Sequence, residues 1–177
     1  MGLLNKTKTY LVGHMQYLDG SDWRRKVTEE LSPLGIICLD PYHKPFLKDV
    51  NEDKNARENR LERLRSGDLE SIHNEMKEIR AYDLNLVDRC DFIVAHIVPE
   101  VASWGSAEEL SLCSRILKPT FISVGDRLKT PLWLLGMFPI HYFYNSVDEI
   151  VEMIKDIDSC KKDIDSRRWK LLRMENR

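Results

Sequence analysis

Asp83 is an acidic residue at a position where the helical pattern around it calls for an apolar one. Met76 and Ile79 precede it by seven and four residues, which is the spacing of side chains on one face of a helix. That face is otherwise apolar and is expected to turn toward the interior. The pattern therefore predicts that Asp83 points inward or into a buried mouth.

Glu109 occupies a similar position on a second predicted helix. It shares a face with Leu112, Cys113 and Ile116, whereas its neighbour Glu108 falls on a more polar face. Because residues three and four apart on a helix are neighbours, Glu109 is predicted to be the half-buried member of this glutamate pair.

Two carboxylates at the mouth of one site are suited to chemistry at an anomeric carbon. One carboxylate can attack or stabilise an oxocarbenium-like centre while the other handles a proton or a sugar hydroxyl. Glycosyl transfer or hydrolysis is therefore the leading reaction class. The alternative for either residue alone is structural, a carboxylate satisfied by backbone N–H groups at a helix end or by an arginine.

Further candidates lie near the loops that follow predicted strands, where ligands of parallel sheets bind. Asp40 and Tyr42 follow the second strand and are candidate contacts to a base edge or a sugar, with a structural role as the alternative. Trp104 is a candidate for stacking on a base, with packing as the alternative. Arg24 and Arg25 are interpreted as a solvated helix face, with a phosphate contact as the alternative.

The elements that must position these residues alternate between strand and helix. Apolar, β-branched runs predict strands, and helical periodicity with N-cap residues predicts helices. This alternation is typical of an α/β protein whose mainly parallel sheet is covered on both faces. The predicted strands are 9–12, 35–39, 91–98, 119–124 and 141–144, and the predicted helices are 23–31, 69–88, 106–117 and 147–157.

Two segments fall outside this alternation. Residues 44–68 are dense in charged residues and are interpreted as an insertion that covers an edge of the sheet or the mouth of the site. Residues 159–177 form a charged tail with Trp169, Leu171 and Leu172 as anchors, expected to dock on a neighbouring subunit or to fray. The domain itself is placed at residues 1–158.

Composition narrows the function classes. The chain of 177 residues has the size of one compact domain. Its 27 basic and 29 acidic residues give a formal net charge of −2, so the charge balance does not indicate a nucleic-acid partner. No apolar run approaches the roughly 20 residues of a membrane span, and the N-terminus lacks the apolar region of a signal peptide. We therefore expect a cytoplasmic protein without a membrane partner.

Several cofactor and metal motifs are missing from the sequence. It contains no dinucleotide-binding, P-loop or serine-hydrolase motif, and its histidines lack metal-ligand spacing, so neither a metal nor an organic cofactor is expected. The four cysteines are scattered and are interpreted as reduced, buried packing residues.

Four stretches of the chain carry a family resemblance. They are Tyr10-Leu11-Val12-Gly13, the pair Asp83-Leu84 with Cys90-Asp91-Phe92-Ile93-Val94-Ala95, Gly105-Ser106-Ala107-Glu108-Glu109-Leu110, and Lys118-Pro119-Thr120. Together they resemble the nucleoside 2-deoxyribosyltransferase family, which includes the 2′-deoxynucleoside 5′-monophosphate N-glycosidases. The third stretch is similar to the family's Gly-Thr-x-x-Glu-Leu element, whose glutamate is the nucleophile.

The resemblance implies a flavodoxin-like, three-layer fold with a five-stranded, mainly parallel sheet. It implies that Glu109 attacks C1′ and carries the glycosyl group while Asp83 and Tyr10 position the nucleophile and the sugar. It also implies a homodimer or larger homo-oligomer, for which the apolar segment 133–140 is a candidate contact. With the loop candidates above, the substrate-binding residues are predicted to be Gly13, His14, Asp40, Tyr42, Ser103, Trp104, Gly105 and Ser106.

Two positions bear on whether the substrate carries a 5′-phosphate. Ser103 stands six residues before Glu109, as in the monophosphate-cleaving branch of the family, where that serine faces the phosphate. His14 stands where this branch has another phosphate-binding serine, and this difference argues against a 5′-phosphate on the substrate. Nucleotides are slightly favoured, and both substrate classes stay open.

The sequence therefore predicts cleavage or transfer of the N-glycosidic bond of a 2′-deoxynucleoside or its 5′-monophosphate, through a glutamate-bound glycosyl intermediate. The acceptor, water or a second base, is open. The alternative is a non-catalytic nucleotide-binding or sensing protein on the same fold. Two desolvated carboxylates argue against it, because burying them costs free energy that a pure binder does not recover.

Overall fold

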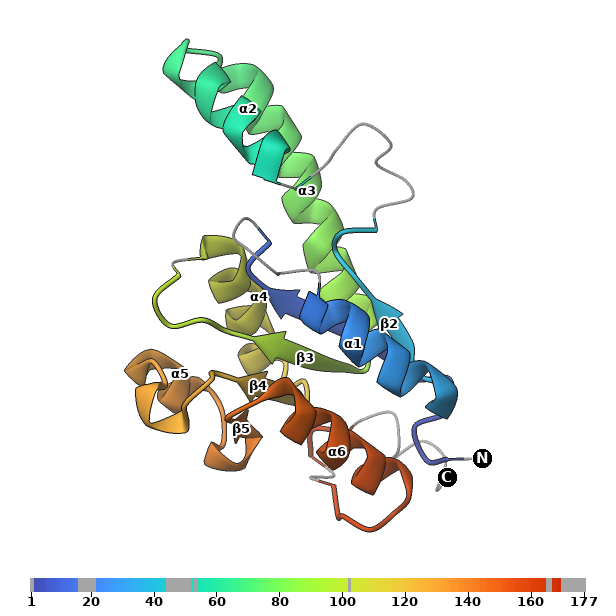
Figure 1. Ribbon diagram of the computed structural model, residues 1–177. Helices are drawn as coiled ribbons and strands as arrows, with labels where there is room; N and C mark the ends of the chain where they lie inside the picture. The colour runs from blue at the N-terminus through green and yellow to red at the C-terminus, as the bar shows by residue number, and fades with distance from the viewer. Residues whose placement is uncertain are drawn as a thin grey trace.

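The computed structural model describes residues 2–15, 22–43, 52, 54–101, 103–164 and 167–169. Their strands form one five-stranded sheet in the order β2-β1-β3-β4-β5, with every pairing parallel (Figure 1). This is the strand order of flavodoxin-like sheets, so the predicted fold class is confirmed. The strands are β1 (Lys8–Gly13), β2 (Ile37–Leu39), β3 (Phe92–His96), β4 (Thr120–Ser123) and β5 (Phe143–Tyr144).

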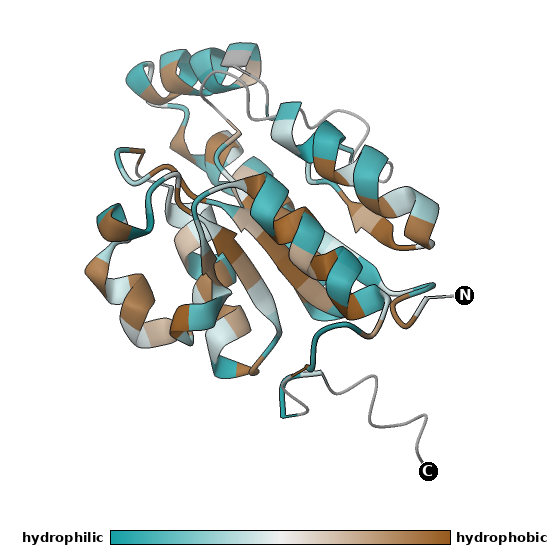
Figure 2. Ribbon diagram, turned by 60° about the horizontal axis from the view of Figure 1, so that its bottom comes forward, coloured by the Kyte–Doolittle hydropathy of each residue, from teal (hydrophilic) through white to brown (hydrophobic). Residues whose placement is uncertain are grey.

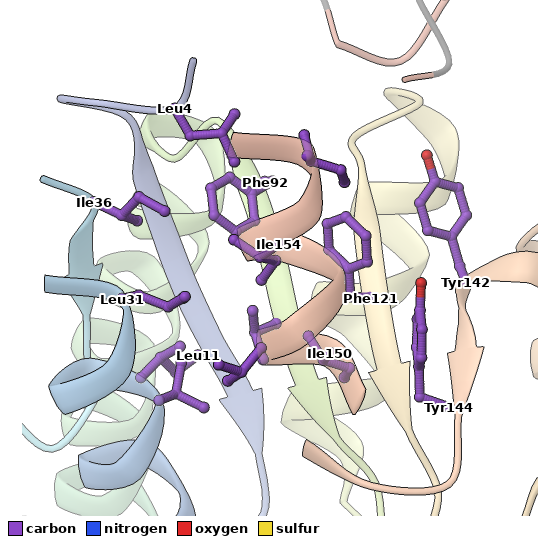
Figure 3. Close-up of a cluster of buried hydrophobic side chains, with 14 of the residues drawn as sticks. Leu4, Leu11, Leu31, Ile36, Phe92, Phe121, Tyr142, Tyr144, Ile150 and Ile154 are labelled. Atoms are coloured by element: carbon purple, nitrogen blue, oxygen red, sulfur yellow. The ribbon is translucent and has the colours of Figure 1, made fainter. Parts of the chain in front are cut away.

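One face of the sheet is covered by α1 (Asp22–Leu31) and α6 (Val147–Asp158). Apolar residues recur on α6 at helical spacing, and its Ile150 and Ile154 are buried. Figure 3 shows them against the sheet, with Phe92 and Phe121 from neighbouring strands and Leu11 from β1. This cluster forms the first of two cores.

The opposite face is covered by α3 (Leu69–Arg89), α4 (Trp104–Arg115) and the short α5 (Leu132–Met137). Side chains alternate along a strand, so Tyr10 and Val12 of β1 face this layer while Leu11 faces the other. In Figure 2 the strands are brown between helices that carry much teal, the pattern of a sheet buried on both faces.

The predicted elements differ from the structure chiefly at their ends. β3 is shorter than the predicted strand 91–98, and β2 begins at Ile37 because Gly35 takes a left-handed conformation after the 3₁₀ helix Ser32–Leu34. The predicted strand 141–144 is correct for Phe143–Tyr144 alone, since Ile140–Tyr142 forms a 3₁₀ helix. Helix α5 was not predicted.

The predicted insertion 44–68 contains a helix, α2 (Lys54–Arg65), which packs along α3. Figure 1 shows α2 and the first part of α3 extending away from the sheet. Arg60 and Arg63 of α2 lie 2.6 and 3.0 Å from carboxylate oxygens of Glu75 on α3. Glu52 lines the pocket discussed below, and the rest of the predicted cover, residues 44–51 and 53, lies outside the described residues.

Trp169 of the predicted tail is buried in the first core. Its ring centroid lies 5.4 Å from that of Phe92 and 6.2 Å from that of Phe121. This anchor therefore docks on its own chain, whereas Leu171 and Leu172 lie outside the described residues. Within the described part of the chain, no helix has both the length and the apolarity to cross a membrane.

The four cysteines carry free thiols in different surroundings. Cys90 and Cys113 are buried, as predicted, and Cys38 is half-buried. Cys160 is exposed, so the prediction is wrong there, because this residue follows the last turn of α6 and lies past its apolar face.

Candidate active site

Tyr10 lies in β1, paired with β3 near the middle of the sheet. Its side chain is buried, and its hydroxyl donates a hydrogen bond of 2.8 Å to Oε1 of Glu109. Strand order reverses between β1 and β3, which is where doubly wound sheets bind ligands. The two residues therefore meet at the position expected for a ligand site.

Glu109 is carried by α4, the helix that follows β3. The residue is 8% exposed, whereas Glu108 beside it is half-buried and pairs with Arg80 of α3. Glu109 was predicted to be half-buried and to be the less exposed of the two glutamates; it is the less exposed one, and its burial is more complete than predicted.

Asp83 reaches the same place from α3. It is 9% exposed and lies between Ile79 and Val87, which are buried four residues away on either side. The inward orientation predicted from this spacing is confirmed. Met76, predicted for the same face, lines the pocket wall and is exposed.

Burial controls the protonation of this cluster. It raises the pKa of Glu109 from the ordinary 4.5 to about 8; the hydrogen bond from Tyr10 opposes this rise, and the charge of Asp83 adds to it. Burial also raises the pKa of the Tyr10 hydroxyl, and the charges of Glu109 and Asp83 act in the same direction. At neutral pH the ligand-free site therefore holds a protonated Glu109 beside a neutral Tyr10.

A pocket of about 410 Å³ opens onto Tyr10, Asp83 and Glu109. This volume lies within the range of small-molecule sites. The pocket gathers most of the site residues predicted from the sequence: Tyr10, Gly13, His14, Asp83, Ser103, Trp104, Gly105, Ser106 and Glu109.

The loop after β1 is held by a buried arginine. Arg24 of α1 donates to the backbone oxygens of Gly13 at 2.7 Å and of Leu11 and His14 at 3.3 Å. Its interpretation as part of a solvated face is therefore wrong, because α1 turns this side chain onto the carboxyl end of β1, where carbonyl oxygens compensate its charge. Arg25, by contrast, is exposed as predicted.

Gly13 is required by the close approach of two strands. A Cβ atom at this position would lie 2.7 Å from the backbone oxygen of His96, the last residue of β3. A larger residue would push β1 and β3 apart at the pocket.

Asp40 and Tyr42 support this loop and do not line the pocket. The Asp40 carboxylate lies 3.8 Å from Nε of Arg24 and accepts the Tyr42 N–H at 3.0 Å. The Tyr42 hydroxyl donates to the backbone oxygen of Met15 at 2.6 Å. The pocket reaches Pro41 between them, so a direct contact of Asp40 or Tyr42 with substrate stays a prediction.

The first turn of α4 forms one rim of the pocket. Ser103 is its N-cap: its hydroxyl accepts the Ser106 N–H at 3.4 Å and donates to the Ser106 hydroxyl at 3.0 Å. Trp104 is 90% exposed, which argues against the packing alternative and leaves base stacking as its predicted role.

Comparisons with known proteins identify the fold. No protein-family model and no curated protein matches the chain. Among solved structures, the 2-deoxyribosyltransferase of the psychrotolerant bacterium Bacillus psychrosaccharolyticus matches with a TM-score of 0.56 and 17% identity, over 82% of this chain and 90% of that chain. The two proteins share a fold. At 17% identity the likeness concerns the fold alone.

The fold also brings residues into the pocket that sequence reasoning missed, among them Glu52 and Arg80. Arg80 precedes Asp83 by three residues, so its helical spacing was a usable signal. Glu52 lies in a charged run that offered none. Among the described residues, no group of three or more His, Cys, Asp or Glu side chains is placed to share a metal ion.

Proposed function

We propose that this chain cleaves or transfers the N-glycosidic bond of a 2′-deoxynucleoside or its 5′-monophosphate, with Glu109 as the nucleophile. The buried hydrogen bond between Tyr10 and Glu109, in a pocket that also holds Asp83, carries the proposal. The fold adds support, because the matching bacterial protein is a 2-deoxyribosyltransferase described as a biocatalyst for nucleoside synthesis.

The proposed reaction proceeds by two displacements at C1′. A carboxylate oxygen of Glu109 bonds to C1′ as the C1′–N bond breaks, and the electron pair of that bond leaves with the base, which takes up a proton from solvent. Water or a second base then attacks C1′ and loses a proton, while the electron pair of the ester bond returns to Glu109. The configuration at C1′ is retained.

Tyr10 and Asp83 have distinct roles in this scheme. The Tyr10 hydroxyl holds Oε1 of Glu109 at 2.8 Å, which restricts rotation of the carboxylate and orients it for attack. Asp83 places a negative charge near the reacting carbon, where positive charge develops in an oxocarbenium-like transition state. It can also accept a hydrogen bond from a sugar hydroxyl.

Ionisation of Glu109 should control the rate. The nucleophile must be charged, yet burial raises its pKa to about 8. We expect kcat/KM to rise with pH up to a plateau above about 8, since this ratio reports ionisations of the unliganded enzyme. A pH–rate series in buffers of constant ionic strength measures this, and a flat profile between pH 5.5 and 9 would contradict the assignment.

The direct test is base release from a panel of 2′-deoxynucleosides and their 5′-monophosphates, followed by chromatography. Glu109→Gln keeps the size of the side chain but loses the nucleophilic charge, so turnover should fall by at least about a thousandfold while binding survives. Glu78→Gln, on the exposed side of α3, is the control and should retain turnover. A 2′-fluoro substrate analogue should leave its glycosyl mass on Glu109, because the fluorine slows breakdown of the intermediate.

One observation favours the alternative of a nucleotide-binding or sensing protein. A protonated Glu109 bonded to Tyr10 also makes an uncharged binding surface. Wild-type protein that binds nucleotides without releasing base, and a Glu109→Gln variant with the same affinity, would support this alternative.

A further inference from the structure

Arg80 is the one lysine or arginine among the described residues that line the pocket. The same pocket is lined by the acidic residues Glu52, Asp83, Glu108 and Glu109. The carboxylates of Glu52, Asp83 and Glu108 would repel an anionic group of the substrate, unless that group lies beside the guanidinium of Arg80.

Arg80 lies on the outer part of the pocket wall. It precedes Asp83 by one helical turn on α3 and reaches across to α4, where its Nε donates to Oε2 of Glu108 at 2.8 Å and its Nη2 to Oε1. The side chains of Arg80 and Glu108 are 61% and 42% exposed. The guanidinium thus presents two N–H groups side by side at the rim, in contact with solvent.

The geometry of this pair suits an exchange of anions. A guanidinium binds a carboxylate and a phosphate through the same two-point arrangement, so the Glu108 oxygens occupy positions that phosphate oxygens would take. Because solvent and salt screen an exposed ion pair, its replacement by a more highly charged anion has a low energetic cost. The α4 N-terminus at Ser103 and Ser106 faces the same pocket and favours negative charge.

We propose that Arg80 is the anion-binding residue of this pocket, recognising a phosphate monoester on the substrate and exchanging Glu108 for it. Glu108 acts as an internal competitor that holds the guanidinium in position when no phosphate is bound. This inference rests on the proposed function for the identity of the substrate, and it adds the residue that discriminates a nucleotide from a nucleoside.

The kinetic test compares a 2′-deoxynucleoside with its 5′-monophosphate in four proteins: wild type, Arg80→Met, Glu108→Gln and the double variant. Arg80→Met should lower the monophosphate-to-nucleoside ratio of kcat/KM at least tenfold, mainly through KM. Glu108→Gln should raise that ratio, and the double variant should behave like Arg80→Met, because removing the competitor has no effect once the guanidinium is absent. Arg80→Lys should restore part of the ratio.

Arg115→Met, which changes an exposed arginine of α4 outside the pocket, is the control and should keep the wild-type ratio. An equal loss of activity toward both substrates in Arg80→Met would overturn the inference, because it would indicate that the ion pair merely joins α3 to α4. A Glu108→Gln ratio equal to or below that of wild type would overturn it as well.

A binding experiment separates this inference from the proposed reaction. Isothermal titration with the 5′-monophosphate should give weaker binding to Arg80→Met and tighter binding to Glu108→Gln than to wild type. Inorganic phosphate should compete with the monophosphate less well in Arg80→Met and better in Glu108→Gln. If no substrate releases base, the catalytic proposal fails while these affinities still decide the role of Arg80. Equal affinity of wild type and Arg80→Met for the monophosphate would overturn that role.

Discussion

The raised pKa of Glu109 makes the stability of the folded protein depend on pH. Its pKa is about 8 in the folded protein against an ordinary value of 4.5, so between these values the native state keeps a proton that the unfolded state has lost. The stability associated with this group is fully present below pH 4.5 and is lost as the pH rises toward 8.

Glu109→Gln should therefore stabilise the protein increasingly with pH. We expect the free energy of unfolding of the variant to exceed that of wild type by little at pH 5 and by at least about 1 kcal/mol at pH 8.5. Chemical denaturation at several pH values measures the difference. For Glu78→Gln, the difference in the free energy of unfolding from wild type should not change with pH. If the free energies of unfolding of Glu109→Gln and wild type depend on pH in the same way, the raised pKa is contradicted.

The burial of Arg24 could not be predicted from its position in the sequence. Its helix position is ordinary, and the two adjacent arginines look equivalent in sequence, yet one is buried beneath the pocket and the other is exposed. The difference arises because α1 crosses the carboxyl end of β1, a tertiary contact that helical periodicity does not contain. Burial lowers the pKa of this guanidinium, while Asp40 raises it.

Arg24→Met should destabilise the protein by about 3 kcal/mol, because it leaves Asp40 and several carbonyl oxygens without their buried partner. Arg25→Met should change stability by less than about 0.5 kcal/mol, as is usual for an exposed side chain. Urea denaturation compares the two variants. Similar losses in both would indicate that Arg24 is not the support of the loop after β1.

At the scale of elements, hydrophobic patterning was sufficient for the sheet and its covering helices but not for α2 or α5. β3 is predictable because Phe92 to Ala95 are all apolar, as a central parallel strand requires. Helix α2 is highly charged and packs on α3 through ion pairs, which leave no periodic apolar signal. Helix α5 is apolar on most sides, so its sequence shows no amphipathic contrast.

The same patterning located the candidate site only in part. Asp83 and Glu109 are predictable because each interrupts an apolar helix face. The Tyr10–Glu109 hydrogen bond joins residues 99 positions apart, and it depends on how α4 lies over β1. Local spacing carries no information on that arrangement.

Helix α2 should move independently of the cores, because it belongs to neither apolar cluster. Glu75→Gln weakens its contacts with Arg60 and Arg63, so amide hydrogen exchange in α2 should accelerate at least about fivefold while the Tm changes by less than about 2 °C. Mass spectrometry of peptides covering residues 54–65 measures this. Glu70→Gln, at an exposed position in the first turn of α3, should leave exchange unchanged, and equal protection in the two variants would contradict the role of Glu75.

At the scale of the whole molecule, several large apolar side chains between residues 128 and 140 are exposed. Leu128 is 96% exposed and Trp133 is 83% exposed, and Leu132 and Ile140 are exposed beside them in sequence. Figure 2 shows α5 brown along most of its length. Clusters of this kind mark association surfaces.

We expect this surface, defined by Leu128, Leu132, Trp133 and Ile140, to be buried between copies of the chain, so that the isolated monomer is not the working form. Leu132→Ser with Trp133→Ser removes two of its four side chains and should reduce the particle mass measured by light scattering at micromolar concentration, with a parallel loss of activity. Leu69→Ser, which removes another exposed leucine, at the start of α3, should leave the mass unchanged. A wild-type protein that is monomeric and active at the assay concentration would contradict the expectation, since Trp133 and its neighbours would then face solvent in the functional state.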